Sequence, residues 1–148
     1  QEIFAAVLSV DRAARRFSLT HRELLGTWAE NAAQFHAGET VAGIIRSVEP
    51  YGVFVELSPN LAGLAESHEG AAAGLQASVY IKSILPARMK VKLILIDTFR
   101  YPSQPSTPRY FFRGDHMDRF VYSPPECGKL IVTDFTLPQS ARTVSLKA

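Results

Sequence analysis

Five short apolar segments separated by turn residues occupy residues 40–96, and this pattern constrains the fold more than any other feature of the sequence. Within the second segment the chain alternates strictly: Val53, Val55 and Leu57 face one way, while Phe54 and Glu56 face the other. Alternation of this kind is typical of a strand with one buried side. The five strands are predicted at residues 40–48, 53–57, 62–65, 77–85 and 89–96.

The order and length of these strands predict a closed five-stranded Greek-key barrel, the oligonucleotide-binding (OB) fold. The fold class is therefore all-β dominated, with an OB barrel over residues 38–98. Residues 1–37 are predicted to form an N-terminal hairpin and a connector helix, and residues 99–148 a linker and a β-rich extension. The side chains predicted to point into the barrel are Val53, Val55, Val79, Ile81, Val91 and Leu93.

The flanking segments carry their own signals. Residues 3–10 and 16–20 are predicted to form a hairpin. Apolar residues that recur at three- and four-residue steps predict one helix over residues 20–35, with Trp28 in the core. Thr20 and Glu23 have the spacing of a capping box at its start. After a proline-rich linker at 101–108, β-prone runs follow at 109–112, 119–122 and 130–135. Because exposed strand edges aggregate, residues 3–10 and 130–135 are expected to pair with each other or to share a core.

Charge is unevenly distributed along the chain. Residues 21–69 hold two Arg against seven Glu, whereas residues 70–113 hold seven Lys or Arg against Asp97 alone. A concentrated basic stretch suits a polyanionic partner, although it is also compatible with a solvated surface. The single cysteine, Cys127, and the lack of an apolar run of about 20 residues predict a cytoplasmic protein without a membrane partner. A first residue other than Met, Gln1, suggests a fragment of a longer chain.

Four stretches in order carry a resemblance to a known family: residues 38–45 (GETVAGII), 48–55 (VEPYGVFV), 61–64 (LAGL) and 74–82 (GLQASVYIK). Together they resemble the S1 RNA-binding domain, the repeated module of the bacterial ribosomal protein of that name. Residues 7–11 and 16–20 resemble, more faintly, the last hairpin of a preceding module, and the helix before residue 37 resembles a connector between modules. This resemblance indicates a fragment of a multi-repeat protein.

The resemblance implies that the chain binds single-stranded RNA on one face of the barrel. Tyr51 and Phe54 match the family's two stacking aromatics. Glu66 stands where the family commonly has a histidine, with His68 two residues later, and the acidic residue usual before the last strand is replaced near Leu85. Strand alternation adds outward aromatic and basic residues, which would stack on bases and neutralise phosphates. The predicted RNA-binding residues are Tyr51, Phe54, His68, Tyr80, Lys82, Arg88, Lys90 and Lys92.

The sequence offers less support for other functions than for RNA binding. The four histidines have no metal-ligand spacing with one another or with Cys127, and no nucleophile elbow, phosphate loop or dinucleotide-binding glycine pattern occurs. We therefore expect no enzyme, cofactor or metal; Asp115, His116 and Asp118 favour a polar turn. The alternative is a protein-interaction module that docks on the ribosome or another assembly without touching RNA. The predicted partners are single-stranded RNA and possibly the ribosome, and the sequence does not predict an oligomeric state.

Overall fold

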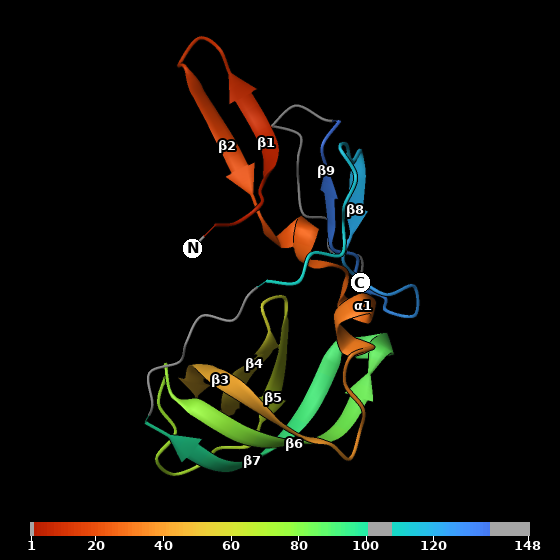
Figure 1. The fold of residues 1–148 in the computed structure, drawn as a ribbon. Coiled ribbons are helices and arrows are strands. Elements are labelled where there is room, and N and C mark those ends of the chain that lie inside the picture. The colour runs from red at the N-terminus through yellow and green to blue at the C-terminus, as the bar shows by residue number, and fades with distance from the viewer. Residues whose placement is uncertain (1, 101–107, 137–148) are drawn as a thin grey trace.

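Five strands close into a barrel in the computed structural model, which describes residues 2–100 and 108–136 (Figure 1). Around the barrel the strands follow the order β3-β4-β5-β7-β6, and β6 pairs back to β3. The pairing of β5 with β7 is parallel and the others are antiparallel. The predicted all-β fold and closed barrel are thus confirmed. The strands are β3 (Thr40–Glu49), β4 (Gly52–Ser58), β5 (Leu61–Ala65), β6 (Gln76–Leu85) and β7 (Lys90–Phe99).

The barrel core follows the predicted alternation. All six side chains expected to point inward are at most 2% exposed, and Leu57 packs against them. Burying a Val, Leu or Ile side chain of this kind contributes about 1.5–3 kcal/mol. Trp28, from outside the barrel sequence, is 3% exposed and belongs to the same cluster. The core therefore extends from the barrel into the segment that precedes it.

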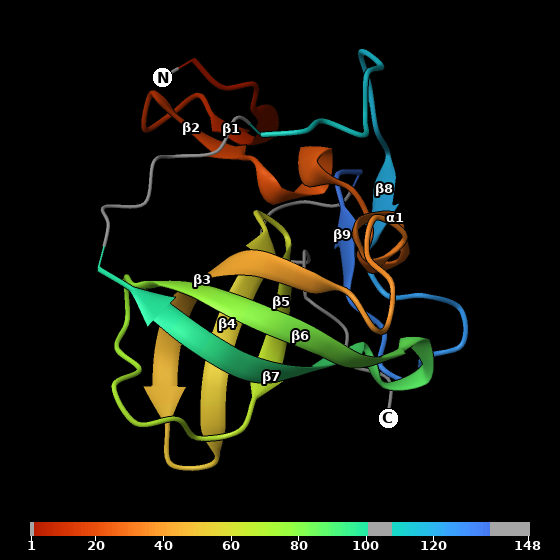
Figure 2. The same cartoon turned by 60° about the horizontal axis from the view of Figure 1, so that its bottom comes forward.

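The N-terminal hairpin forms as predicted and lies outside the barrel (Figure 1). Strand β1 (Ala6–Asp11) pairs with β2 (Arg16–Thr20) in a separate two-stranded sheet. Figures 1 and 2 show the hairpin and the C-terminal strands on the same side of the barrel, with the connector between them.

The prediction of one connector helix is wrong. The segment consists of a 3-10 turn, η1 (Arg22–Leu25), and a short helix, α1 (Trp28–Ala32). Gly26 separates them at φ +92°, and a Cβ there would lie 2.6 Å from the ring of Phe111. The capping box is formed by Thr27 and Glu30 at the start of α1, and not by Thr20 and Glu23. Close packing against a remote aromatic ring therefore interrupts the helix that periodicity indicates.

The described part of the C-terminal extension, residues 108–136, contains one strand pair, β8 (Arg119–Val121) with β9 (Val132–Asp134). Residues 109–112, expected to be β-prone, form no strand, and the predicted linker at 101–107 lies outside the described residues. The expected pairing of residues 3–10 with 130–135 is also wrong, because β1 pairs with β2 and β9 with β8. Nor do these strands share a core: Val132 is buried, whereas Val7 and Val10 are more than half exposed. Within the described residues, no helix has the length and apolar character needed to cross a membrane.

Asn60, in the turn between β4 and β5, joins three parts of the chain. Its side-chain amide donates to the carbonyl oxygens of Arg22 (3.2 Å) and Gly26 (2.8 Å) in the connector. The backbone carbonyl of Asn60 accepts a 2.7 Å hydrogen bond from the hydroxyl of Tyr122, the residue that follows β8. The backbone of Tyr122 in turn accepts a 2.9 Å bond from the Trp28 amide. Barrel, connector and extension are therefore fastened at one point.

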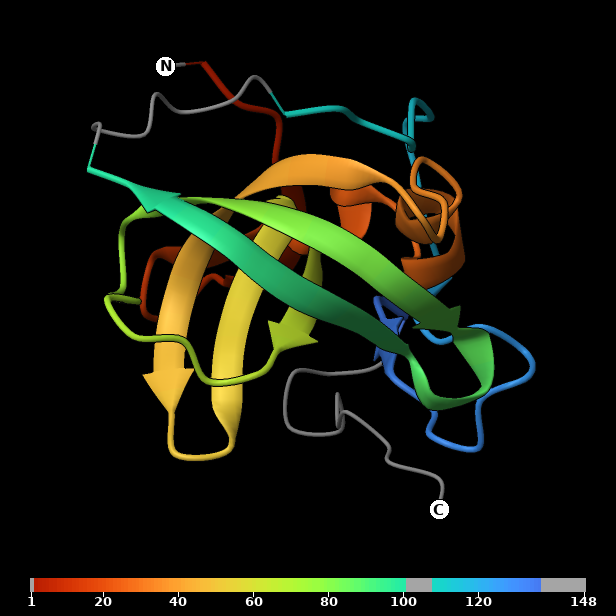
Figure 3. The ribbon, with the colours of Figure 1, turned by 90° about the horizontal axis from the view of Figure 1, so that it is seen from below.

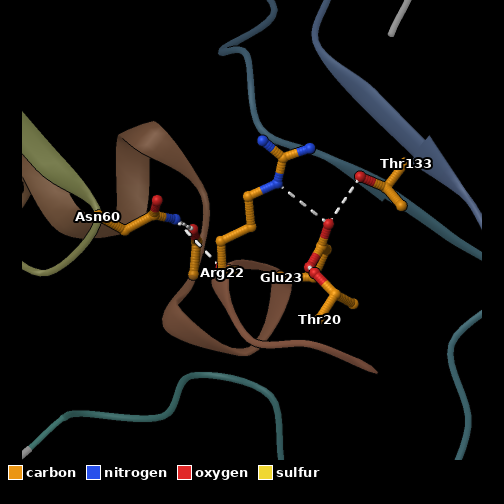
Figure 4. A network of polar contacts seen from close by, with 6 residues as sticks. Thr20, Arg22, Glu23, Asn60 and Thr133 are labelled. Atoms are coloured by element: carbon orange, nitrogen blue, oxygen red, sulfur yellow. Dashed lines mark hydrogen bonds and ion pairs between the residues drawn. The ribbon is translucent and has the colours of Figure 1, made fainter. Parts of the chain in front are cut away.

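Glu23 forms a second junction, on η1 (Figure 4). Glu23 is 1% exposed. Its carboxylate accepts hydrogen bonds from the hydroxyls of Thr20 and Thr133 (2.8 Å for Thr133) and forms an ion pair with Arg22 (3.2 Å). Burial by itself raises the pKa of this carboxyl, but those hydrogen bonds and one from the backbone together hold the pKa below its ordinary value of 4.5. The charge is thus retained inside the protein because it is fully partnered.

Candidate nucleic-acid interface

An aromatic pair stands where the chain turns from β3 into β4. The rings of Tyr51 and Phe54 meet edge to face, with centroids 6.0 Å apart and an interplanar angle of 84°. Gly52 makes this turn possible, since a Cβ there would lie 2.5 Å from the carbonyl oxygen of Ala65 and 2.9 Å from Leu64. The described flanking segments leave Tyr51 68% exposed. The pair therefore presents ring surface to solvent.

Cross-strand pairing extends this aromatic pair into a row on the outer face of the barrel. Phe54 on β4 pairs with Leu64 on β5, and Leu64 pairs with Lys92 on β7. The residues before and after Phe54 and Lys92 point into the core, so these side chains point outward. The row therefore leads from an aromatic ring, across an aliphatic side chain, to an ammonium group.

Further cations lie near the Lys92 end of the row. Lys90 is two residues earlier on the same face of β7, and Arg88 ends the 3-10 turn η2 (Pro86–Arg88) that leads into this strand. Lys82 occupies a β-bulge of β6 opposite Lys92. Figures 2 and 3 show the end of β5 between the β3–β4 turn and η2. All four cations are exposed, and none enters an ion pair within residues 2–100 and 108–136.

One of the predicted site residues lies away from this row. Tyr80 points outward from β6, but it pairs with Thr40 on β3 and with Ile94 on β7, which places it farther around the barrel. His68 is exposed in the loop after β5. The structure thus separates Tyr80 from a group of six predicted residues, and it leaves His68 in the loop that follows β5. The six are Tyr51, Phe54, Lys82, Arg88, Lys90 and Lys92.

The structure adds residues that sequence reasoning missed. Leu64 connects Phe54 to Lys92, and its position depends on the parallel register of β5 and β7. Glu56, two residues after Phe54 on the same face of β4, forms an ion pair with Arg46 of β3. The alternation of β4 already placed Glu56 beside Phe54, but its partner depends on strand pairing. Glu56 is the one carboxylate that β4 presents on the outer face of the barrel, and the ion pair with Arg46 compensates its negative charge.

The described part of the chain was predicted to hold a polar turn at residues 115–118. It contains no cluster of three His, Cys, Asp or Glu side chains able to hold an ion. His116 and Asp118 form an exposed pair, 2.6 Å between Nε2 and Oδ1, within the turn before β8.

Comparison with known proteins finds sequence similarity to ribosomal protein bS1 and to a reductase. No family model matches. Ribosomal protein bS1 of Staphylococcus aureus is 28% identical over 134 aligned residues, which cover 80% of this chain and 34% of that protein. A bS1 homologue of Bacillus subtilis is 35% identical over 65 residues, covering 43% and 17% respectively. The 4-hydroxy-3-methylbut-2-enyl diphosphate reductase of Fusobacterium nucleatum is 32% identical over 97 residues, covering 65% and 12%.

A solved structure of an uncharacterised protein from Methanocaldococcus jannaschii aligns over 42% of this chain and 93% of that one, with 22% identity and a TM-score of 0.39.

The closed barrel with strand order β3-β4-β5-β7-β6 is an OB fold. The 28% identity to bS1 over 80% of the chain, together with this barrel, fits an S1-type OB-fold domain. The chain spans about a third or less of the length of these curated relatives.

Proposed function

We propose that the barrel binds single-stranded RNA across the row formed by Tyr51, Phe54, Leu64 and Lys92. One observation carries the proposal: the aromatic pair at the start of β4 lies on the same outer face as a group of cations that form no ion pair within the described residues, with only β5 between β4 and β7. Bases stack on aromatic rings for about 1–3 kcal/mol each, and nearby ammonium or guanidinium groups neutralise phosphates. The names of the bS1 relatives support a setting in translation or RNA metabolism, with the ribosome as a partner and the cytoplasm as the location.

The chemistry of the row favours a single strand over a duplex. Stacking on Tyr51 or Phe54 requires a base whose face is free, and the bases of a double helix are already stacked. Because every base offers a ring face, we expect weak sequence preference. Lys90, Lys92 and Arg88 would follow the backbone of the strand as it leaves the aromatic pair. Tyr80 would contact RNA only if the strand continued around the barrel.

A protein-interaction module is the second candidate, and one observation favours it. Along β7 the outer face changes from lysines to exposed apolar residues, Ile94 and Ile96, beside Tyr80 on β6. Exposed apolar patches mark contact surfaces. We propose no catalysis, because the reductase match covers only 12% of that protein and catalytic motifs are lacking in this sequence.

A titration with labelled oligonucleotides separates the two candidates. The chain would be titrated with a fluorescein-labelled unstructured 12-nucleotide RNA, and with a blunt duplex of the same length, at 50 and 200 mM salt. RNA binding predicts measurable affinity for the single strand, a loss of affinity at the higher salt and weaker binding of the duplex. No binding at 50 mM salt, or tighter binding of the duplex, would remove the proposal and leave the interaction module.

A further inference from the structure

A cleft of about 1130 Å³ lies between the N-terminal segment and the C-terminal extension, and none of its lining residues belongs to the row on the barrel. Residues 4–7 line one side and residues 108–117 the other, together with Leu24 and Phe135. We call this space the extension cleft. Pockets for single small molecules usually measure about 300–1,000 Å³. The extension cleft is therefore large enough for a stretch of a chain molecule.

Tyr110 fastens the two sides of the extension cleft to each other. Its hydroxyl accepts a 3.0 Å hydrogen bond from the backbone N–H of Phe4 and lies 3.0 Å from Nε2 of His21. The rings of Phe4 and Tyr110 meet edge to face, with centroids 5.3 Å apart. The next residue, Phe111, donates a 3.0 Å backbone bond to the carbonyl of Leu24 (Figure 2). Contacts between segments remote in the sequence thus hold the cleft in shape.

Two arginines give the extension cleft a cationic lining. Arg109 and Arg113 are exposed, and neither forms an ion pair within residues 2–100 and 108–136. The guanidinium of Arg109 lies 4.9 Å from the centroid of the Phe111 ring and donates a 3.4 Å hydrogen bond to Gln34. Because a guanidinium carries several N–H donors, others remain free for a ligand. Asp115 is the one carboxylate among the described lining residues, so the cleft favours an anion.

The extension cleft also presents an aromatic ring to solvent. Phe4 is 72% exposed, although it lies in the lining and contacts Tyr110 through one ring edge. A nucleobase that stacks on such a ring contributes about 1–3 kcal/mol. An exposed ring next to cations without carboxylate partners is the combination that binds single-stranded nucleic acid, whereas an apolar peptide makes no use of the cations.

We propose that the extension cleft is a second binding site for single-stranded RNA, in which a base stacks on Phe4 and phosphates contact Arg109 and Arg113. The site lies on the flanking segments and outside the OB barrel. It extends the proposed function of the barrel to a second part of the chain. Because the two sites share no residue, each can be tested while the other stays intact.

The two methionines of the chain provide one probe for each site. Met117 lines the extension cleft, whereas Met89 lies between Arg88 and Lys90 at the cationic end of the row. The chain, labelled with ¹³C at its methionine methyl groups, would be titrated with an unstructured six-nucleotide RNA, and Met117→Leu assigns the two NMR signals. Both signals should shift, each along its own binding curve. A shift of Met117 alone would support the extension cleft and remove the barrel site, and a shift of Met89 alone would overturn the present proposal.

Removing the cations tests the phosphate contacts. Arg109→Ala with Arg113→Ala should weaken the binding that Met117 reports by at least about tenfold at 50 mM salt, and should reduce its salt slope by about 1.4, while binding at the barrel stays unchanged. Arg119→Ala with Lys129→Ala, which removes two exposed cations of the extension that do not line the cleft, should change neither quantity. Binding at Met117 that is as tight in the first variant as in wild type would overturn the proposal.

Phe4→Ala should weaken the binding reported by Met117 by about tenfold without changing its salt slope, because a stacking surface is lost and no charge is. Phe17→Ala is the control, since Phe17 is 68% exposed and does not line the cleft. Equal binding by Phe4→Ala and wild type would overturn the stacking role. Loss of the Met117 shift in Lys90→Ala with Lys92→Ala would mean that the shift is transmitted from the barrel, and this too would overturn the proposal. So would a shift of Met117 with an uncharged apolar hexapeptide but not with RNA, which would make the cleft a protein-binding site.

Discussion

The hydroxyl of Thr133 donates a 2.8 Å hydrogen bond to the carboxylate of Glu23, although the two residues are 110 positions apart in the chain. Strand β9 is thereby tied to the connector that leads into the barrel. Glu23 is almost completely buried, so its charge depends on Thr133, Thr20 and Arg22 (Figure 4). The stability of the junction should consequently depend on the ionisation of a single carboxyl group.

Replacing Glu23 by Gln should lower the free energy of unfolding by about 1.5–3 kcal/mol at pH 7, because charge-assisted hydrogen bonds are lost. The folded-state pKa lies below 4.5, so this contribution is fully present above pH 4.5 and is lost as the pH falls through the folded pKa. The difference in the free energy of unfolding between wild type and Glu23→Gln should therefore be smaller at pH 3 than at pH 7. Urea denaturation at pH 7, 5 and 3 measures it, with the exposed Glu126→Gln as control. A difference that stays constant with pH would contradict the expectation.

Replacing Tyr122 by Phe should cost about 0.5–1.5 kcal/mol, since the carbonyl of Asn60 loses its 2.7 Å hydrogen bond. Burial raises the pKa of Tyr122 to about 12 from an ordinary value of 10. Its contribution is therefore complete below pH 10 and declines as the pH rises toward 12. Denaturation between pH 8 and 11.5 should show a smaller alkaline decline in Tyr122→Phe than in wild type. Tyr51→Phe, at an exposed tyrosine, should decline as wild type does.

Replacing Phe54 by Ala should weaken single-stranded RNA binding by about 1–3 kcal/mol with little change in salt dependence, because a stacking surface is lost and no charge is. Phe99→Ala is the matched control, since Phe99 is a phenylalanine on the outside of the barrel that is exposed, whereas Phe54 is partly buried, and it lies outside the row. Fluorescence anisotropy at two salt concentrations gives both quantities. Equal binding by Phe54→Ala and wild type would mean that this face does not stack bases.

Replacing Lys90 and Lys92 together by Ala should reduce the slope of log K against log salt by about 1.4, since each phosphate contact on a single strand contributes about 0.7. Arg119→Ala with Lys129→Ala removes two exposed charges from the extension and should leave the slope unchanged. The same anisotropy titrations, carried out at four salt concentrations, determine it. Equal reductions by the two double variants would indicate general attraction to a basic protein.

The barrel could be predicted from sequence because its information is local. Strict alternation in β4 and β7 specifies which side chains enter the core, and turn residues separate the strands. The connector could not be predicted in the same way. Its apolar period is helical, but the break at Gly26 is set by Phe111, a ring 85 positions away that periodicity does not report.

The candidate site was predicted only in part for a related reason. The resemblance to the S1 domain implies that Tyr51 and Phe54 act together, and alternation predicts that Lys90 and Lys92 point outward. Alternation distinguishes inside from outside, but it does not say where on a closed barrel an outward residue lies. Alternation alone therefore groups Tyr80 with Phe54 and does not identify Leu64 as a site residue. The pairing of β5 with β7 is needed to define the row.

The fastening of the connector by Asn60 has a consequence for avidity. A flexible linker lets two binding units sample many separations. The effective concentration of the second unit at its own contact point is then low, but it is similar over a wide range of distances. Here the carbonyls of Arg22 and Gly26 are held against the barrel, so any unit built on β1–β2 would keep a nearly constant orientation. Binding of one strand by both units at once would then be strong when its two contact points lie at the matching separation. It would be weak when the contact points are closer together or farther apart. Selectivity in such a protein would come from distance along the polymer and not from its order of bases.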